Sequence, residues 1–154
     1  MANTDNSCAR LEIEDVYSNS KDTLGDIMEL QKDTQQNVYG YQFDEMSLRE
    51  LMFFWHTNNH SIIDELHEAT DALGGISNGG NAIWKTWKKD YSKYENMKFS
   101  DLSESDQIEC KFEIVDILHF FLNMAISIGM TPQELFNMYM SKNKENRERQ
   151  LRGY

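Results

Sequence analysis

The sequence predicts an all-helical protein with one domain. Helix-forming residues dominate the 154-residue chain, which has nine Met and a single Pro. Alternation of apolar and polar residues with a period of two, which half-buried strands require, is scarce. The length suits one domain, and a hydrophobic content of 40% suits one core. We therefore expect a bundle of about five helices.

The first two helices are predicted from apolar spacing and from signals at their ends. The first spans about residues 22–39, where apolar side chains recur at helical intervals. The second begins at a capping box, in which Ser47 and Glu50 exchange side-chain to backbone hydrogen bonds. It ends at Gly74 and Gly75, which favour a helix stop, and a flexible loop follows.

Three further helices complete the expected bundle. The third carries AIWKTWKKDY, residues 82–91, with its aromatic side chains at helical spacing. The fourth begins at a cap formed by Ser103 and ends near Ile128. The fifth begins where Thr131 precedes a Pro at the first helical position and Glu134 follows at the third.

No change in composition marks a domain boundary, so residues 21–154 are predicted to form one helical domain after a loose N-terminus at 1–20. Cys8 and Cys110 lack metal-type spacing and are expected to be reduced thiols of a cytoplasmic protein. The N-terminus has no apolar signal core, and polar residues interrupt the longest apolar run, 117–130. We therefore expect no membrane span.

The net charge of the chain excludes one broad class of partner. At pH 7 the formal charge is -11. A general nucleic-acid binder needs a basic face, so we expect no nucleic-acid partner. A small anionic ligand remains compatible with this charge, because a local basic patch is enough to bind it.

Four carboxylates suggest a metal site. Glu65 and Glu68 stand three residues apart, as do Glu113 and Asp116, so each pair projects from one helical face. The second pair is surrounded by Ile, Val, Leu and Phe, which predicts a central helix with apolar surface nearly all round. Buried carboxylates repel one another and are costly to ionise. A hard divalent cation such as Mg²⁺ resolves this conflict and prefers oxygen ligands.

Other interpretations of these residues stay open. Glu65 and Glu68 alone fit a solvated acidic edge, because E-x-x-E is common on helix surfaces. Asp116 with His119 resembles half of a di-iron motif, but such proteins carry that motif on two helices and it occurs once here. His119 and His67 are better explained as packing residues or as residues that contact the metal ligands without binding the metal.

A basic stripe near the C-terminus suggests phosphate binding. Residues 142–154 carry five basic and two acidic side chains, a local charge of +3. Lys142, Asn146 and Arg149 follow one helical face, whereas a frayed, solvated end would need no such spacing. Lys and Arg neutralise phosphate oxygens, and a cationic stripe facing a metal suits a nucleoside triphosphate. The sequence has no P-loop.

Weaker candidates come from two other segments. Lys85 is a possible phosphate ligand, while the neighbouring Trp84 and Trp87 are expected in the core or a dimer interface. Gln31 and Gln35 lie four residues apart, and side-chain amides can read the edge of a base. Two glutamines on a helix carry little weight alone.

These motifs resemble a known family. ELHEA at 65–69 with EIVDILHF at 113–120 is similar to the E-x-x-E and E-x-x-D motifs of the all-α nucleoside triphosphate pyrophosphatases, which include dimeric dUTPases and MazG. AIWKTWKKDY, the segment 106–130 and the tail 139–154 resemble the dCTP/dUTP pyrophosphatases of T-even-type tailed phages. LQKDTQ is similar to the first motif of that family. The likeness runs from about Leu24 to Tyr154 and is weakest at 39–60.

The resemblance implies a homodimer with a MazG-like fold that hydrolyses dCTP and dUTP to monophosphate and pyrophosphate with Mg²⁺. It implies that this activity clears ordinary pyrimidine deoxynucleotides from the host cytoplasm during phage DNA replication. By position, the implied ligands are Glu65, Glu68, Glu113 and Asp116 for metal, Lys142, Asn146, Arg149 and Tyr154 for sugar and phosphates, and Gln31 for the base. Gln35 stands where dimeric dUTPases usually have Asn, which suggests broader pyrimidine specificity.

The expected mechanism uses Glu65 as the base that takes a proton from the attacking water. Lys142, Arg149 and Lys85 are expected to stabilise charge on the phosphates. Three rivals stay open: a MazG-like enzyme for another nucleotide, a di-iron carboxylate protein, and a helical binding protein without turnover.

Overall fold

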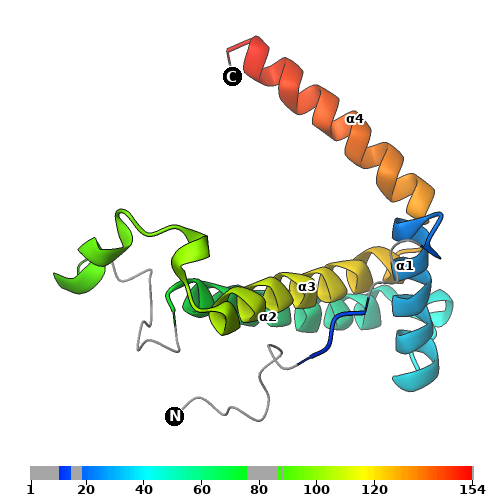
Figure 1. The fold of residues 1–154 in the computed structure, drawn as a ribbon. Helices are drawn as coiled ribbons and strands as arrows, with labels where there is room; N and C mark the ends of the chain where they lie inside the picture. The colour runs from blue at the N-terminus through cyan, green and yellow to red at the C-terminus, as the bar shows by residue number, and fades with distance from the viewer. Residues whose placement is uncertain (1–10, 15–18, 76–86, 88, 154) are drawn as a thin grey trace. The chain divides into compact units, whose positions relative to one another are not determined.

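The computed structural model describes residues 11–14, 19–75, 87 and 89–153. Every element within these ranges is helical (Figure 1), which confirms the predicted all-α class. The four α-helices are α1 (Thr23–Asp33), α2 (Leu48–Leu73), α3 (Glu104–Ser127) and α4 (Pro132–Leu151). The shorter elements are a π-helical turn, η4 (Thr34–Val38), and the 3-10 turns η5 (Phe43–Glu45), η7 (Lys89–Tyr94) and η8 (Phe99–Asp101).

The start and end of α2 are as predicted. The backbone N–H of Ser47 donates to the Glu50 carboxylate at 2.8 Å, and the N–H of Glu50 donates to the Ser47 hydroxyl at 3.3 Å. These bonds satisfy donors that a helix N-terminus otherwise leaves free. At the other end, Gly75 has a φ of +78°, a conformation that favours glycine and ends the helix.

The predicted caps of α3 and α4 are also present. The Ser103 hydroxyl accepts the N–H of Asp106 at 3.1 Å. The Thr131 hydroxyl accepts the N–H of Glu134 at 3.1 Å, and the Glu134 carboxylate accepts the N–H of Thr131 at 2.9 Å. Pro132 occupies the first turn, where its missing N–H costs no hydrogen bond.

The first and third predicted helices differ from expectation. The α-helix expected over 22–39 ends at Asp33 and continues as η4, in which Tyr39 donates its N–H to the carbonyl of Thr34, five residues back. The third expected helix, 82–91, lies largely outside the described residues. Its described end belongs to the 3-10 turn η7. The described part of the chain therefore has four α-helices where the sequence predicted five.

Contacts along the chain define two units, to which α2 and α3 both contribute. The carboxylate unit comprises Met1–Asp15 with His56–Phe121, and the core unit comprises Val16–Trp55 with Leu122–Tyr154. The predicted boundary at residue 20 stays a prediction.

The core unit holds the main apolar cluster. Five side chains from α1, η5, α2 and α3 are buried together: Met28, Phe43, Phe54, Leu122 and Ile126. The rings of Phe43 and Phe54 meet edge to face with centroids 5.3 Å apart. Beside this cluster, the indole N–H of Trp55 donates to the Ser127 hydroxyl at 2.9 Å. The cluster and this bond join α2 to the last turn of α3 within the unit.

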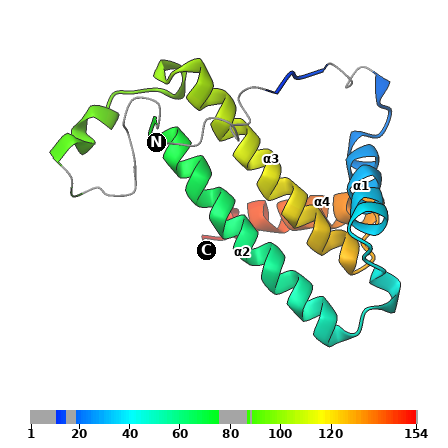
Figure 2. The ribbon, with the colours of Figure 1, turned by 90° about the horizontal axis from the view of Figure 1, so that it is seen from below.

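The carboxylate unit places α2 beside α3 (Figures 1 and 2). Ala69 and Ala72 of α2 are buried, which allows a close approach of the backbone. The end of α2 is held by the Tyr94 hydroxyl, which donates to the carbonyl of Gly74 at 2.9 Å. Small residues at this end of α2 therefore allow α3 to lie close to α2.

The expectation that the fourth helix is covered nearly all round is wrong for the single chain. On α3, Ile114 is 56% exposed, Leu118 is 40% exposed and Phe121 is 47% exposed. These three side chains recur at helical spacing and form one stripe. The single chain therefore leaves an apolar face of α3 uncovered.

None of the described helices is by itself long and apolar enough to span a membrane. The one pair that meets this test together is α3 with α4, and it is bent by 107° at the break.

Candidate active site

Three of the four predicted carboxylates meet between α2 and α3. One carboxylate oxygen from each of Glu65, Glu68 and Glu113 lies within 4.8 Å of the other two. The two glutamates of α2 are three residues apart, so one turn of the helix presents both towards Glu113. Glu113 is only 4% exposed, Glu65 is half-buried and Glu68 is exposed. We call these three residues the carboxylate cluster.

The electrostatics of the cluster show unneutralised negative charge. Burial raises the pKa of Glu113 to about 8, aided by a hydrogen bond with Glu65 and by the charge of Glu68. The pKa of Glu68 is also raised, first by burial and then by the charge of Glu65. Each group is easier to protonate because its neighbours are anionic, and a cation would relieve the same repulsion.

Asp116 lies beside the cluster without being one of its three members. Its charge contributes to the raised pKa of Glu68. Its carboxylate also lies 3.3 Å from Nδ1 of His119. The predicted roles of Asp116 as a ligand and of His119 as its neighbour stay predictions.

The sequence reasoning missed Glu109. Its charge raises the pKa of both Glu113 and Glu68. Glu109 precedes Glu113 by four residues on α3, so the two project from one face. The spacing E-x-x-x-E-x-x-D was visible in the sequence and could have identified it.

The donor chemistry of the cluster fits a hard divalent cation. Carboxylate oxygens are the ligands that Mg²⁺ and Ca²⁺ take in proteins. The three oxygens come from two helices that the fold of the carboxylate unit already holds together, so little reorganisation is needed. A cation would also replace the proton that Glu113 holds.

The predicted basic stripe lies on α4, in the core unit. Lys142 and Asn146 are exposed. Arg149 donates from Nε to Glu145 at 2.9 Å, and Arg152 donates to the same carboxylate oxygen at 2.8 Å. Glu145, which the sequence reasoning missed, therefore holds Arg149 against its own helix. The i, i+4 spacing of Glu145 and Arg149 could have predicted this pair from the sequence.

The two predicted base-reading glutamines have different surroundings. Gln31, near the end of α1, donates from Nε2 to Oδ1 of Asn123 at 2.7 Å. Gln35 is buried within η4. Lys85 and Tyr154 lie outside the described residues, so their predicted roles stay predictions.

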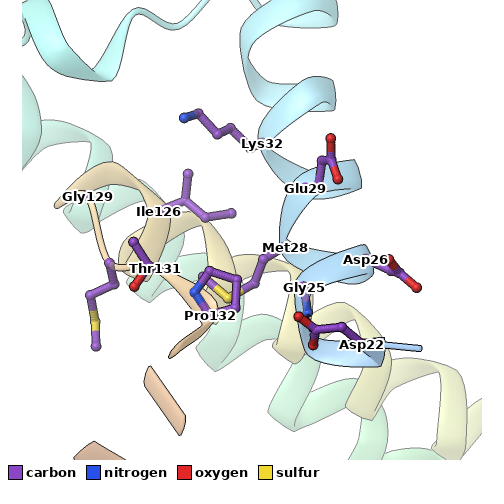
Figure 3. A pocket seen from close by; sticks show the side chains of 11 residues that line it. Asp22, Gly25, Asp26, Met28, Glu29, Lys32, Ile126, Gly129, Thr131 and Pro132 are labelled. Atoms are coloured by element: carbon purple, nitrogen blue, oxygen red, sulfur yellow. Dashed lines mark hydrogen bonds between the residues drawn. The ribbon is translucent and has the colours of Figure 1, made fainter. Parts of the chain in front are cut away.

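A cavity of about 490 Å³ in the core unit involves none of the predicted ligands. It lies along α1, from Asp22 to Lys32, and against the turn between α3 and α4 (Figure 3). Its charged lining side chains are three carboxylates and one amine: Asp22, Asp26, Glu29 and Lys32. This lining is net acidic, so it suits a triphosphate poorly.

Two phage proteins are similar to the chain over long stretches. The dCTP pyrophosphatase of Enterobacteria phage T4 is 36% identical over 167 aligned positions, which cover 97% of this chain and 98% of that protein. The chain belongs to the phage dCTP pyrophosphatase family. The dCTP pyrophosphatase of Enterobacteria phage LZ5 is 45% identical over 108 residues, 68% of this chain and 63% of that protein. No family model and no solved structure matches.

Membership of the dCTP pyrophosphatase family confirms the predicted family and the predicted enzyme class, a pyrophosphatase-type hydrolase. A third relative extends beyond this chain. A "DNA replication protein" of phage T4 is 34% identical over 157 residues, which cover 90% of this chain and 40% of that protein. The aligned region therefore makes up less than half of that relative.

Proposed function

We propose that the protein hydrolyses dCTP and dUTP to the monophosphate and pyrophosphate with the help of Mg²⁺. The observation that carries this proposal is the carboxylate cluster of Glu65, Glu68 and Glu113 in a member of the dCTP pyrophosphatase family. The raised pKa values of Glu113 and Glu68 mark the place where these carboxylates converge as a site that a cation would stabilise.

Glu65, Glu68 and Glu113 hold the metal in this proposal, and Asp116, oriented by His119, completes the set. Bound there, Mg²⁺ supplies charge neutralisation for the phosphates and makes a nearby water more acidic.

Glu65 takes the proton from the attacking water in this proposal. A general base must reach water, and Glu65 is half-buried whereas Glu113 is almost completely buried. Glu113 therefore serves as a fixed ligand and Glu65 as the group that exchanges a proton.

The basic side chains of α4 bind the phosphates. Lys142 is exposed and available, while Arg149 exchanges its Glu145 partner for a phosphate. An Arg–carboxylate pair that is largely exposed contributes little to stability, so substrate can displace it. Asn146, Tyr154 and Lys85 complete the phosphate and sugar contacts.

Gln31 reads the pyrimidine edge, because its amide offers both an acceptor and a donor. Gln35, four residues further on and buried within η4, is the second base-reading residue of this proposal.

A second copy of the chain covers the exposed apolar stripe of α3. Ile63 and Leu66 of α2 are exposed in the same unit, at 45% and 49%. Apolar side chains that recur on two helices of one unit suit a homodimer interface. In the host cytoplasm such an enzyme would clear dCTP and dUTP during phage replication.

The decisive experiment is pyrophosphate release from dCTP, dUTP, dTTP and dATP, each with Mg²⁺ and with EDTA. Mg²⁺-dependent turnover of dCTP and dUTP alone supports the proposal. Turnover of purines favours a MazG-like enzyme. No turnover of any triphosphate, or iron in protein purified without chelator, contradicts it.

A further inference from the structure

One contact in the core unit connects a predicted base reader to a residue that the sequence did not single out. Nε2 of Gln31 on α1 donates to Oδ1 of Asn123 on α3 at 2.7 Å. Asn123 is 4% exposed, and Gln31 is half-buried. The bond therefore joins a buried amide to one that solvent or a ligand can reach.

This bond determines which way the Gln31 amide faces. A glutamine amide has one acceptor oxygen and two N–H donors. With one N–H bound to Asn123, Oε1 and the second N–H of Gln31 are left for other partners. While the Asn123 amide keeps its orientation, a half-turn of the Gln31 amide would bring two carbonyl oxygens together and lose the bond. Asn123 thus favours one orientation of Gln31.

We propose that Asn123 is a positioning residue that makes Gln31 select cytosine over uracil. This inference rests on the proposed function, in which Gln31 reads the base. Cytosine presents an amine beside an unprotonated ring nitrogen, which match Oε1 and the remaining N–H of Gln31. Uracil presents a carbonyl beside a ring N–H, so both contacts become repulsive. To accept uracil, the Gln31 amide must rotate, which breaks its bond to Asn123 while the Asn123 amide keeps its orientation.

The position of Asn123 within α3 agrees with this role. It follows Asp116 by seven residues, which is two helical turns along the same face of the helix. A single helix therefore carries predicted metal ligands and, further along, the residue that orients the base reader. A buried polar side chain at this position is otherwise costly in a helix rich in apolar residues.

The first test compares kcat/KM for dCTP and dUTP in the wild type and in Asn123→Leu. The wild type is expected to prefer dCTP. Loss of one oriented hydrogen bond should lower the dCTP to dUTP ratio by about tenfold. Asn123→Asp keeps an acceptor oxygen and should keep the ratio. Gln31→Ala should lower the ratio, and adding Asn123→Leu to it should change the ratio no further.

Controls separate positioning from loss of fold. Ser127→Ala removes another buried polar group from α3 and should leave the ratio unchanged. Asn123→Ser, which is too short to reach Gln31, replaces Asn123→Leu if circular dichroism shows that the latter is unfolded. In wild-type protein without substrate, one side-chain N–H of Gln31 should exchange slowly with solvent, and this protection should vanish in Asn123→Leu.

The outcomes distinguish the two proposals. If the wild type hydrolyses no pyrimidine triphosphate, the proposed function fails and this inference fails with it. If the wild type hydrolyses dCTP but the ratio is the same in Asn123→Leu or Asn123→Ser, only the positioning role is overturned. A wild-type enzyme without preference for dCTP overturns it as well.

Discussion

One carboxylate oxygen of Glu65 on α2 and one of Glu113 on α3 lie within 4.8 Å of each other. Burial raises the pKa of Glu113 to about 8, aided by the nearby carboxyl group of Glu65. The metal-free cluster is therefore a proton-binding site at neutral pH. A divalent cation competes with that proton for the same oxygens, which links stability, pH and metal binding.

The metal-free protein should become less stable as pH rises from about 4.5 to about 8. Glu113 has an ordinary pKa of 4.5 and a folded-state pKa of about 8, so between these values the folded state binds more protons than the unfolded state. The free energy of unfolding then falls as pH rises. Denaturant titrations in EDTA across this range measure the slope.

Glu113→Gln should flatten this pH dependence, because its amide does not titrate. Mg²⁺ should stabilise the wild type more at pH 8 than at pH 6, since it displaces the proton less easily at low pH. A slope of opposite sign in the wild type, or an unchanged slope in Glu113→Gln, would show that Glu113 does not carry this proton.

Glu113→Gln should abolish pyrophosphate release while the protein stays folded. The change removes a metal ligand and keeps the size of the side chain, so a loss of about a hundredfold or more in kcat is expected. Asp64→Asn is the matched control, because it removes a neighbouring charge outside the cluster. Activity near the wild-type level in Glu113→Gln would exclude the cluster as the metal site.

Glu145→Gln should strengthen substrate binding, because it weakens the bond between Glu145 and Arg149. The present pair joins Nε of Arg149 to Glu145 at 2.9 Å, and a phosphate must displace it. We expect KM for dCTP to fall by about two- to threefold, consistent with the small energy of exposed pairs. Arg149→Ala should raise KM or lower kcat, and Arg147→Ala should do neither, because Arg147 projects from another face of α4. Equal effects of the two Arg variants would contradict a specific stripe.

Leu118→Glu should convert the proposed homodimer to monomer. Leu118 lies in the exposed apolar stripe of α3, and an unpaired charge buried there is costly. Sedimentation analysis should show the dimer dissociation constant raised by about a hundredfold or more. Leu151→Glu on α4, at a position that is 88% exposed, is the control and should stay dimeric. A wild-type chain that sediments as a monomer refutes the dimer directly.

Thr131→Ala should lower the free energy of unfolding by about 1 kcal/mol, as loss of an N-cap generally does. The hydroxyl accepts the N–H of Glu134 at 3.1 Å at the start of α4. Thr131→Ser keeps that acceptor and should retain most of the stability. Chemical denaturation of the three proteins provides the comparison, and equal stability of all three would exclude a capping contribution.

The capping boxes at Ser47 and Thr131 were predictable because both partners of each bond lie within three residues. Local spacing alone therefore determines where α2 and α4 begin. The end of α1 was not predictable in this way. The wider turn of η4 depends on a hydrogen bond from Tyr39 to the carbonyl of Thr34, five residues back. Apolar periodicity does not distinguish backbone hydrogen bonds that span five residues from those that span four.

The candidate site was likewise predictable only where it depends on local spacing. The E-x-x-E spacing predicted that Glu65 and Glu68 share a face, but not that Glu113 would come within 4.8 Å of both. Asp116 shares the face of Glu113, yet it is paired with His119 at 3.3 Å. The pairing of Glu145 with Arg149 was not predicted, although the two residues have the i, i+4 spacing at which such pairs form on a helix.

The sequence by itself determined the helical class, the starts of α2, α3 and α4 and the residue types that could hold a cation, because these depend on neighbours within about one helical turn. The family also followed from the sequence, because short motifs identify it. Only the tertiary structure decided that burial raises the pKa of Glu113 and that Asn123 binds Gln31, 92 residues away along the chain. Such contacts depend on how helices that are distant in sequence pack against each other, and local spacing does not specify that packing.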